Sequence, residues 1–190
     1  MLQIKNIYKQ YKTGTLVQKV LDGVNLNLRD NEFVAILGPS GSGKTTLLNI
    51  IGGLDRYDDG DLIINGISTK KYKDRDWDIY RNHRIGFIFQ SFNLLDTLTV
   101  KENIIYNREN ISDETVKEVC DTVGLTHFIK TLPNGFDSVI GENDSVSAGQ
   151  RQLLTIARGM IEDSPFLILD EATSNVDTRT EELVQKAMDK

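Results

Sequence analysis

Three stretches of the chain are almost continuously apolar: residues 32–38 (EFVAILG), 84–90 (RIGFIFQ) and 165–171 (PFLILDE). A strand that is buried on both faces of a sheet has such a run, because neither face needs polar side chains. Segments with helical patterns separate the three runs along the chain. Because strands that alternate with helices are typical of parallel sheets, the runs predict strands of a parallel core sheet.

Two other stretches predict antiparallel strands beside that sheet. Residues 24–28 alternate between apolar and polar side chains, which is the period of a strand with one buried face. Residues 62–64 and Ile67 flank the dipeptide Asn65-Gly66, which favours the tight turn of a β-hairpin. We therefore expect an N-terminal antiparallel β subdomain.

The middle of the chain, residues 91–145, is polar and helix-like, and it separates two of the predicted core strands. Residues 147–161 then place apolar side chains at helical spacing, and Ser164-Pro165 ends that pattern. Further on, Asp177 predicts the N-cap of another helix. The pattern as a whole predicts an α/β fold with a mainly parallel core sheet and an inserted helical subdomain.

Composition narrows the class of protein. A formal net charge of −6 disfavours a general nucleic-acid binder, since such proteins are usually basic. The single cysteine, Cys120, cannot form an internal disulfide, and no run of about eighteen apolar residues predicts a membrane span. We expect a soluble, acidic, intracellular protein with no nucleic-acid partner. The charged segment 70–78 (KKYKDRDWD) predicts a solvated face, with Trp77 as a partly exposed anchor.

Residues 38–45 (GPSGSGKT) fit the pattern GxxxxGK(S/T) and lie between a predicted buried strand and a predicted helix. Glycines let the backbone turn so that successive amides point at phosphate oxygens, and the following helix adds its positive end. Lys44 supplies a charge for the β- and γ-phosphates, and the Thr45 hydroxyl can ligate magnesium. The motif therefore predicts a P-loop NTPase. Its candidate nucleotide-binding residues are Gly38, Pro39, Ser40, Gly41, Ser42, Gly43, Lys44, Thr45 and Thr46.

The loop alone does not decide between kinases, GTPases and motor ATPases. Four further stretches resemble the nucleotide-binding domain of ABC transporters. They are the Walker B strand and its carboxylate at 166–171 (FLILDE), the signature at 146–152 (VSAGQRQ), the Q-loop residue Gln90, and the D-loop at 174–177 (SNVD). Val146 and Ala148 depart from the family's usual signature, LSGGQ. The order of the four stretches, across nearly the whole chain, makes the resemblance specific.

The resemblance implies ATP and Mg²⁺ as cofactors, and it assigns catalytic and metal-binding roles. Asp170, Thr45 and Gln90 would hold the magnesium. Glu171 would polarise the attacking water as the general base, and Gln90 and Lys44 would assist the reaction.

The resemblance also implies roles in binding the rest of the nucleotide. Ser147, Gly149 and Gln150 would face the γ-phosphate held by a second subunit, where the start of their helix contributes its positive end. Tyr11 would stack on the adenine. Tyr8 is a neighbouring alternative for this role. A second alternative is that Tyr11 is an ordinary packed tyrosine with no contact to the nucleotide.

The implied organisation is a single ABC-type ATPase domain over residues 1–190. Residues 1–90 would form the β subdomain and the P-loop core, residues 91–160 the helical subdomain with the signature, and residues 161–190 a shortened C-terminal core. The implied partners are a second ABC-type ATPase domain, as a homodimer or a heterodimer, and transmembrane permease subunits. The expected location is the cytoplasm, peripheral on the inner face of the cell membrane.

Two features depart from the family. Its members carry a switch histidine one strand beyond the helix that follows the D-loop, and this chain ends at Lys190, inside that expected helix. We therefore expect ATP binding to suffer less than hydrolysis. Residues 1–105 resemble the lipoprotein-release and macrolide-export group, whereas the remainder, with GEN at 141–143, resembles multidrug exporters. This difference indicates a chimera, either natural or engineered.

Two alternatives to a working transporter motor follow. One is a truncated or chimeric nucleotide-binding fragment with weak or no turnover. The other is a non-transport ABC-type ATPase that acts on chromosomes or ribosomes, against which the acidic charge and the GEN segment count.

Overall fold

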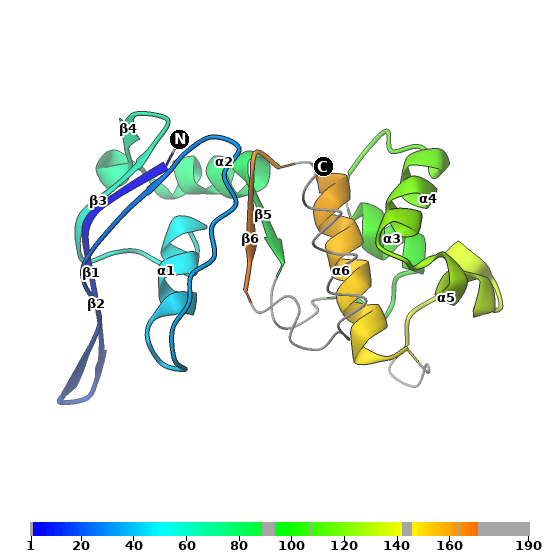
Figure 1. The fold of residues 1–190 in the computed structure, drawn as a ribbon, viewed down its shortest axis with the longest axis horizontal. Helices are drawn as coiled ribbons and strands as arrows, with labels where there is room; N and C mark the ends of the chain where they lie inside the picture. The colour runs from blue at the N-terminus through cyan, green and yellow to red at the C-terminus, as the bar shows by residue number, and fades with distance from the viewer. Residues whose placement is uncertain (1, 89–93, 107, 142–145, 163, 171–190) are drawn as a thin grey trace. The chain divides into compact units, whose positions relative to one another are not determined.

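The computed structural model describes residues 2–88, 94–106, 108–141, 146–162 and 164–170. The chain divides into two compact units, residues 1–84 and residues 85–190, and each is described by itself (Figure 1). Five predicted features lie wholly or partly outside the described residues: Gln90, the GEN segment at 141–143 beyond Gly141, Glu171, the D-loop and the helix expected after Asp177.

The first unit is built on a four-stranded antiparallel sheet with the strand order β2-β1-β3-β4. Its strands are β1 (Leu2–Thr13), β2 (Leu16–Leu28), β3 (Asp59–Ile64) and β4 (Ile67–Ser68). Asn65 and Gly66 have positive φ angles of 50° and 81°, as a type I′ turn requires, and Ile64 pairs with Ile67. The predicted hairpin and the predicted strand at 24–28 are therefore confirmed.

Helices α1 (Lys44–Ile51) and α2 (Asp74–Arg84) and the 3-10 turn η1 (Thr69–Lys71) complete this unit. Trp77 of α2 is only 2% exposed, so the prediction of a partly exposed anchor is wrong. The rings of Tyr72 and Tyr80 pack edge-on against the indole at centroid distances of 5.3 and 5.8 Å. The Arg56 guanidinium covers it at 4.4 Å. These neighbours come from tertiary packing, which the charged residues around Trp77 in the sequence do not reveal.

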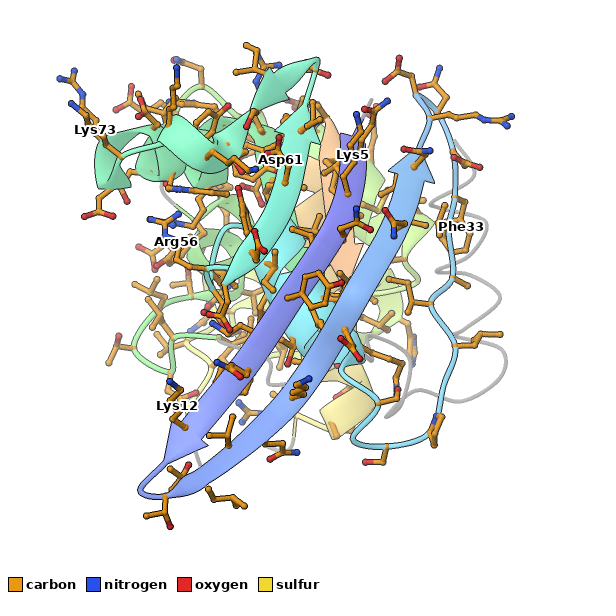
Figure 2. All side chains as sticks on the ribbon, turned by 90° about the vertical axis from the view of Figure 1, so that its left-hand side faces the viewer. Lys5, Lys12, Phe33, Arg56, Asp61 and Lys73 are labelled. Carbon is orange, nitrogen blue, oxygen red and sulfur yellow. The ribbon has the colours of Figure 1, made fainter. Side chains whose placement is uncertain are left out.

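The apolar run at 32–38 forms no strand, so the prediction of a buried core strand at this position is wrong. Phe33 is 68% exposed and Leu37 is 90% exposed, and Figure 2 shows Phe33 on the segment that follows β2. A strand is held by hydrogen bonds to a neighbouring strand, and none of the described strands pairs with this segment. An apolar run shows that burial would be favourable, but it does not provide the pairing partner.

The second unit contains a parallel pair of strands and a set of helices. Its elements are β5 (Ile85–Ile88), α3 (Val100–Ile105), α4 (Asp113–Thr122), α5 (Thr126–Thr131), the 3-10 turn η2 (Gly135–Asp137), α6 (Ala148–Glu162) and β6 (Phe166–Leu169). Ile85 pairs with Phe166 and Ile88 with Leu169, which confirms the predicted parallel pairing of these two runs. None of the described helices is both long and apolar enough to span a membrane.

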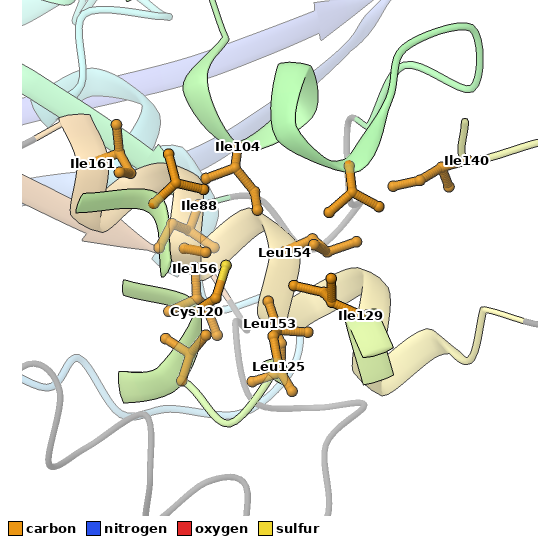
Figure 3. Packing of buried hydrophobic residues seen from close by; sticks show 14 residues of the cluster. Ile88, Ile104, Cys120, Leu125, Ile129, Ile140, Leu153, Leu154, Ile156 and Ile161 are labelled. Atoms are coloured by element: carbon orange, nitrogen blue, oxygen red, sulfur yellow. The ribbon is translucent and has the colours of Figure 1, made fainter. Parts of the chain in front are cut away.

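Helix α6 lies at the centre of the apolar core of this unit, as Figure 3 shows. Its position agrees with the helix predicted at 147–161. Leu154, Ile156 and Ala157 are almost completely buried. At Gly159 an added Cβ would lie 2.9 Å from Ile88 Cδ1, so α6 and β5 pack closely here. Burial raises the pKa of the Cys120 thiol in the same core to about 12.

One buried polar side chain interrupts this core. Gln152 on α6 is completely buried, and neither its Nε2 nor its Oε1 has a hydrogen-bond partner in the described structure. Because an unpaired buried amide keeps its desolvation cost, we expect Gln152→Met to raise the free energy of unfolding by about 1–2 kcal/mol. Urea unfolding followed by circular dichroism measures the change. An unchanged or lower stability would contradict the prediction.

Candidate nucleotide-binding site

The segment 38–45 follows β2 and leads into α1. Gly41 and Gly43 have φ angles of +78° and +89°, in the left-handed region that favours glycine. At Gly43 an added Cβ would also lie 2.9 Å from the carbonyl oxygen of Val20. Both the backbone conformation and the space therefore require glycine at Gly43. The predicted glycine-dependent turn before the helix is present.

The N-terminus of α1 is open to an anion. Its N-cap, Gly43, makes no side-chain capping hydrogen bond, and the first turn holds no acidic residue. The first amides of a helix have no partner within the helix, and its dipole makes this end positive. Lys44 adds a full charge here: its Nζ donates to the carbonyl oxygens of Gly38, at 2.9 Å, and Pro39, at 3.0 Å. Left-handed glycines, an uncapped helix end and a lysine together fit a phosphate group.

The hydroxyl-bearing residues of the loop have two settings. Thr45 lies exposed in the first turn of α1, where a hydroxyl ligand suits a hard cation such as Mg²⁺. Thr46, the next residue, is half-buried. Ser42 closes the loop through its amide, which donates to the carbonyl of Pro39 at 3.2 Å. Of the two threonines, Thr45 is therefore the one that is accessible to a metal ion.

Asp170 lies directly after β6, at the carboxyl end of the parallel pair. Its amide donates to the carbonyl of Ile88 at 3.0 Å, so the β5–β6 ladder continues to this residue. Ligands of α/β sheets bind at the carboxyl ends of parallel strands. Asp170 therefore has the setting that a metal-holding carboxylate needs. Gln90 and Glu171, which the sequence assigns to the same edge, lie outside the described residues.

The signature residues Ser147 and Gln150 cap α6 reciprocally. The Gln150 amide donates to Ser147 Oγ at 3.2 Å, and the Ser147 amide donates to Gln150 Oε1 at 2.9 Å. This is a capping box, and its S-x-x-Q pattern was present in the sequence but not interpreted as one. Arg151, also missed, reaches toward Asp96 at 3.5 Å and the Gly141 carbonyl at 3.4 Å. Gly149 lies within the same first turn.

Tyr11 lies on β1 with 41% of its surface exposed. Its hydroxyl donates to Asp55 Oδ2 at 2.6 Å, and Lys9 Nζ donates to Asp55 Oδ1 at 2.8 Å. The Asp55 amide in turn donates to the carbonyl of Asn49 at 3.2 Å, which ties Tyr11 through Asp55 to α1, the helix of the phosphate loop. Tyr8 is equally exposed, but its hydroxyl lies over Gly23 of β2. This difference favours Tyr11 over Tyr8 as the residue next to a bound nucleotide.

Lys9 and Asp55 are residues of this site that the sequence analysis missed. Burial raises the pKa of the Asp55 carboxyl, but hydrogen bonds from Lys9, Tyr11 and the Arg56 amide outweigh it and hold that pKa below its usual range. Partial burial, and then the hydrogen bond to Asp55, raises the pKa of the Tyr11 hydroxyl. Near neutral pH the carboxylate therefore accepts and the phenol donates. Lys9 and Asp55 lie 46 residues apart in the sequence, and no local pattern indicates that they pair.

The phosphate-binding loop before α1, together with a parallel strand pair that ends in a carboxylate, defines a P-loop NTPase. The sequence model of the family described as "ABC transporter" matches residues 21–174. The chain belongs to this family.

Relatives of known name match along nearly the whole chain. The ABC transporter ATP-binding protein MJ0796 of Methanocaldococcus jannaschii is 35% identical over all of this chain and 81% of its own length. The bacitracin export ATP-binding protein BceA of Halalkalibacterium halodurans is 36% identical over 95% of this chain and 70% of its own length. The macrolide export ATP-binding/permease protein MacB of Rhodopirellula baltica is 37% identical over 96% of this chain.

Some relatives are much longer than this chain. It spans 26% of the length of MacB and 39% of an ABC transporter ATP-binding protein of Mycoplasma pneumoniae. Two solved structures confirm the fold class, an α/β P-loop core with an antiparallel β part and helices. The dimeric MJ0796 cassette bound to ADP and Pi has a TM-score of 0.80 at 35% identity and is covered to 81%. A bacterial Atm1-family exporter with ATP bound has a TM-score of 0.86 at 28% identity and is covered to 32%.

Proposed function

We propose that this chain is the ATP-binding and ATP-hydrolysing motor domain of an ABC-type membrane transporter, working as a dimer with composite sites. The proposal rests on the phosphate-binding loop. Two glycines with positive φ lead into the uncapped N-terminus of α1, and Lys44 is the first residue of that helix. Membership of the ABC transporter family supports ATP as the nucleotide, and the related cassette MJ0796 was solved with ADP and Pi bound.

The residues of this chain would divide the work as follows. The amides of 38–45 and Lys44 would hold the β- and γ-phosphates. Thr45, Asp170 and Gln90 would hold Mg²⁺, which when bound neutralises charge on the phosphates. Glu171 would orient and polarise the attacking water.

The remaining assignments concern the ends of the nucleotide. Tyr11 would stack on the adenine ring. Ser147, Gly149 and Gln150 would approach the γ-phosphate of a second subunit through the positive end of α6. For Ser147 and Gln150, the capping box holds both side chains at the helix start from which they would do so.

We infer that the partners are a second ATPase domain, identical or different, and permease subunits in the membrane. The related MJ0796 cassette was solved as a dimer, and the relative MacB is named as a combined ATP-binding and permease protein. Relatives named for bacitracin and macrolide export make export the proposed direction. The chain would then act at the inner face of the membrane. The division at residues 90 and 160 into subdomains is part of this proposal.

Two narrower hypotheses from the sequence remain untested. One is that the chain joins two branches of the family. Single relatives that align with 95–100% of the chain, as BceA and MJ0796 do, are also what one ancestry would give. The other is that turnover by this chain is weak. Direct measurement of turnover decides this second hypothesis.

The test is phosphate release by the purified chain with MgATP, beside the variant Glu171→Gln. We expect saturable turnover that falls about 100-fold in the variant, because the variant lacks the general base, while ATP affinity is unchanged. Binding without turnover in either protein would reduce the chain to a nucleotide-binding fragment. Failure to bind MgATP at all would overturn the proposal.

A further inference from the structure

The hydroxyl of Tyr11 is held by Asp55. It donates to Asp55 Oδ2 at 2.6 Å. Because the oxygen lies on the long axis of the ring, this bond fixes the direction of the ring but not its rotation about that axis. The Lys9 ammonium, 4.9 Å from the ring centroid, favours the rotation that presents a face of the ring to it. Asp55 and Lys9 together therefore orient the Tyr11 ring.

Asp55 is itself held firmly enough to act as an anchor. Its amide donates to the carbonyl of Asn49 at 3.2 Å, at the end of α1. Its Oδ1 accepts from the amide of Arg56 at 2.7 Å and from Lys9 Nζ at 2.8 Å. Charge-assisted bonds of this kind are stronger than those between neutral groups. The carboxylate therefore keeps its place while it accepts the proton of Tyr11.

Lys9 is a lysine whose position suggests a role beyond solubility. It is only 8% exposed, and its Nζ also donates to the carbonyl of Arg56 at 2.6 Å. The same ammonium lies 4.9 Å from the centroid of the Tyr11 ring, a cation–π distance. The cation approaches one face of the ring, yet Tyr11 remains 41% exposed. The opposite face is the one on which a planar group can stack.

We propose that Asp55 and Lys9 are positioning residues that hold the Tyr11 ring as a platform for the base of a bound purine nucleotide, in register with the phosphate-binding helix α1. This proposal rests on the proposed function, in which Tyr11 contacts the base. Because the hydroxyl donates its proton to Asp55, the platform acts through its face and not through a hydrogen bond to the base. Lys9 acts through Asp55 and the ring, and it does not touch the nucleotide.

The platform affects only ligands that carry a base, and this gives a selective test. Titration calorimetry with the full chain measures the Kd for MgATP and for inorganic tripolyphosphate with Mg²⁺. We expect Tyr11→Ala to raise the Kd for MgATP about 5- to 150-fold, the range for loss of one base–aromatic stack. We expect Asp55→Asn to raise it about 3- to 10-fold, as partial loss of that stack. Neither change should alter the Kd for tripolyphosphate.

Two further variants isolate the mechanism. Asp58→Asn removes a carboxylate of the same loop that accepts from the Gln10 amide, at 2.7 Å, whereas the Tyr11 hydroxyl donates to Asp55. It should change neither Kd. The double variant Lys9→Met with Asp55→Asn leaves no unpaired buried charge, so it should fold even if Asp55→Asn alone does not. It should still weaken the binding of MgATP only.

The outcomes separate the inference from the function on which it rests. Weaker MgATP binding in Tyr11→Ala but normal binding in both Asp55 variants would overturn the positioning role and leave the function intact. Equal weakening of both ligands in Asp55→Asn would show a structural role only and would also overturn it. Normal MgATP binding by Tyr11→Ala would remove the platform itself. Failure of the unaltered chain to bind either ligand would overturn the proposed function.

Discussion

Lys44→Met is expected to reduce phosphate release from MgATP about 1,000-fold or more and to raise the Kd for MgATP. In the structure Lys44 Nζ donates to the carbonyls of Gly38 and Pro39, so the ammonium already lies at the loop that would hold the phosphates. Charge that develops on a transferring phosphoryl group is stabilised by such a preplaced cation, and removal of a single donor or cation of this kind costs about 10²–10⁵ in rate. The measurement is steady-state phosphate release with parallel calorimetry.

Methionine keeps most of the length of the lysine stem, so the change tests the charge and its two hydrogen bonds. Lys71→Met, at an exposed residue of η1, is the matched control and should leave both quantities unchanged. Lys44→Arg keeps the charge but presents a planar fork in place of a compact ammonium, so it should restore little activity. If Lys44→Met keeps its turnover, the loop at 38–45 is not the site of chemistry.

The parts of the site that the sequence predicted are those that depend on local backbone conformation. Gly41 and Gly43 adopt positive φ, and the Asn65-Gly66 turn forms, because few residue types tolerate these conformations. Where the backbone conformation permits only a few residue types, the sequence itself indicates that conformation. The same holds for the end of β6, where an apolar run changes abruptly to Asp170.

The parts that the sequence did not predict depend on contacts between distant residues. Lys9 and Asp55 pair across 46 positions, and neither residue type nor spacing marks the pair. Trp77 is covered by Arg56, which lies outside the charged segment 70–78 that surrounds Trp77 in the sequence. For residues 32–38 the sequence predicted too much structure: the apolar residues indicated a buried strand, but no described strand pairs with this segment. Periodicity describes which side chains favour burial, whereas pairing and stacking are decided by the rest of the fold.

The second large effect that we expect is on stability, in the unit that carries the signature. Asn103 of α3 is completely buried. Its Oδ1 accepts from the Leu95 amide at 2.9 Å, and its Nδ2 donates to the carbonyls of Leu95 and Leu98, at 3.0 and 3.2 Å. It therefore closes the loop that leads into α3 in the way a backbone turn would.

The same residue joins α3 to α6. Arg158 of α6 donates through Nη2 to Asn103 Oδ1, at 3.1 Å, and through Nε to the Asn103 carbonyl, at 2.7 Å. We expect Asn103→Ala to lower the free energy of unfolding by about 3 kcal/mol, because each lost bond contributes about 1 kcal/mol and the partly buried amide of Leu95 and guanidinium of Arg158 each lose a partner. Asn134→Ala is the matched control, since Asn134 is exposed and makes no side-chain cap. Urea unfolding of both variants measures the difference.

A loss of stability alone would not show that the network couples the two helices, and a double-mutant cycle does. If Asn103 and Arg158 act as one unit, the combination of Asn103→Ala with Arg158→Met should cost less than the sum of the single changes, by about 1 kcal/mol or more. Additive effects would mean that the loop and the helix contact are independent. Coupling would mean that a disturbance at the loop before α3 reaches α6, the helix whose first turn carries Ser147 and Gln150. The position of the signature residues would then depend on Asn103, a side chain that is not itself part of the signature or of the proposed nucleotide site.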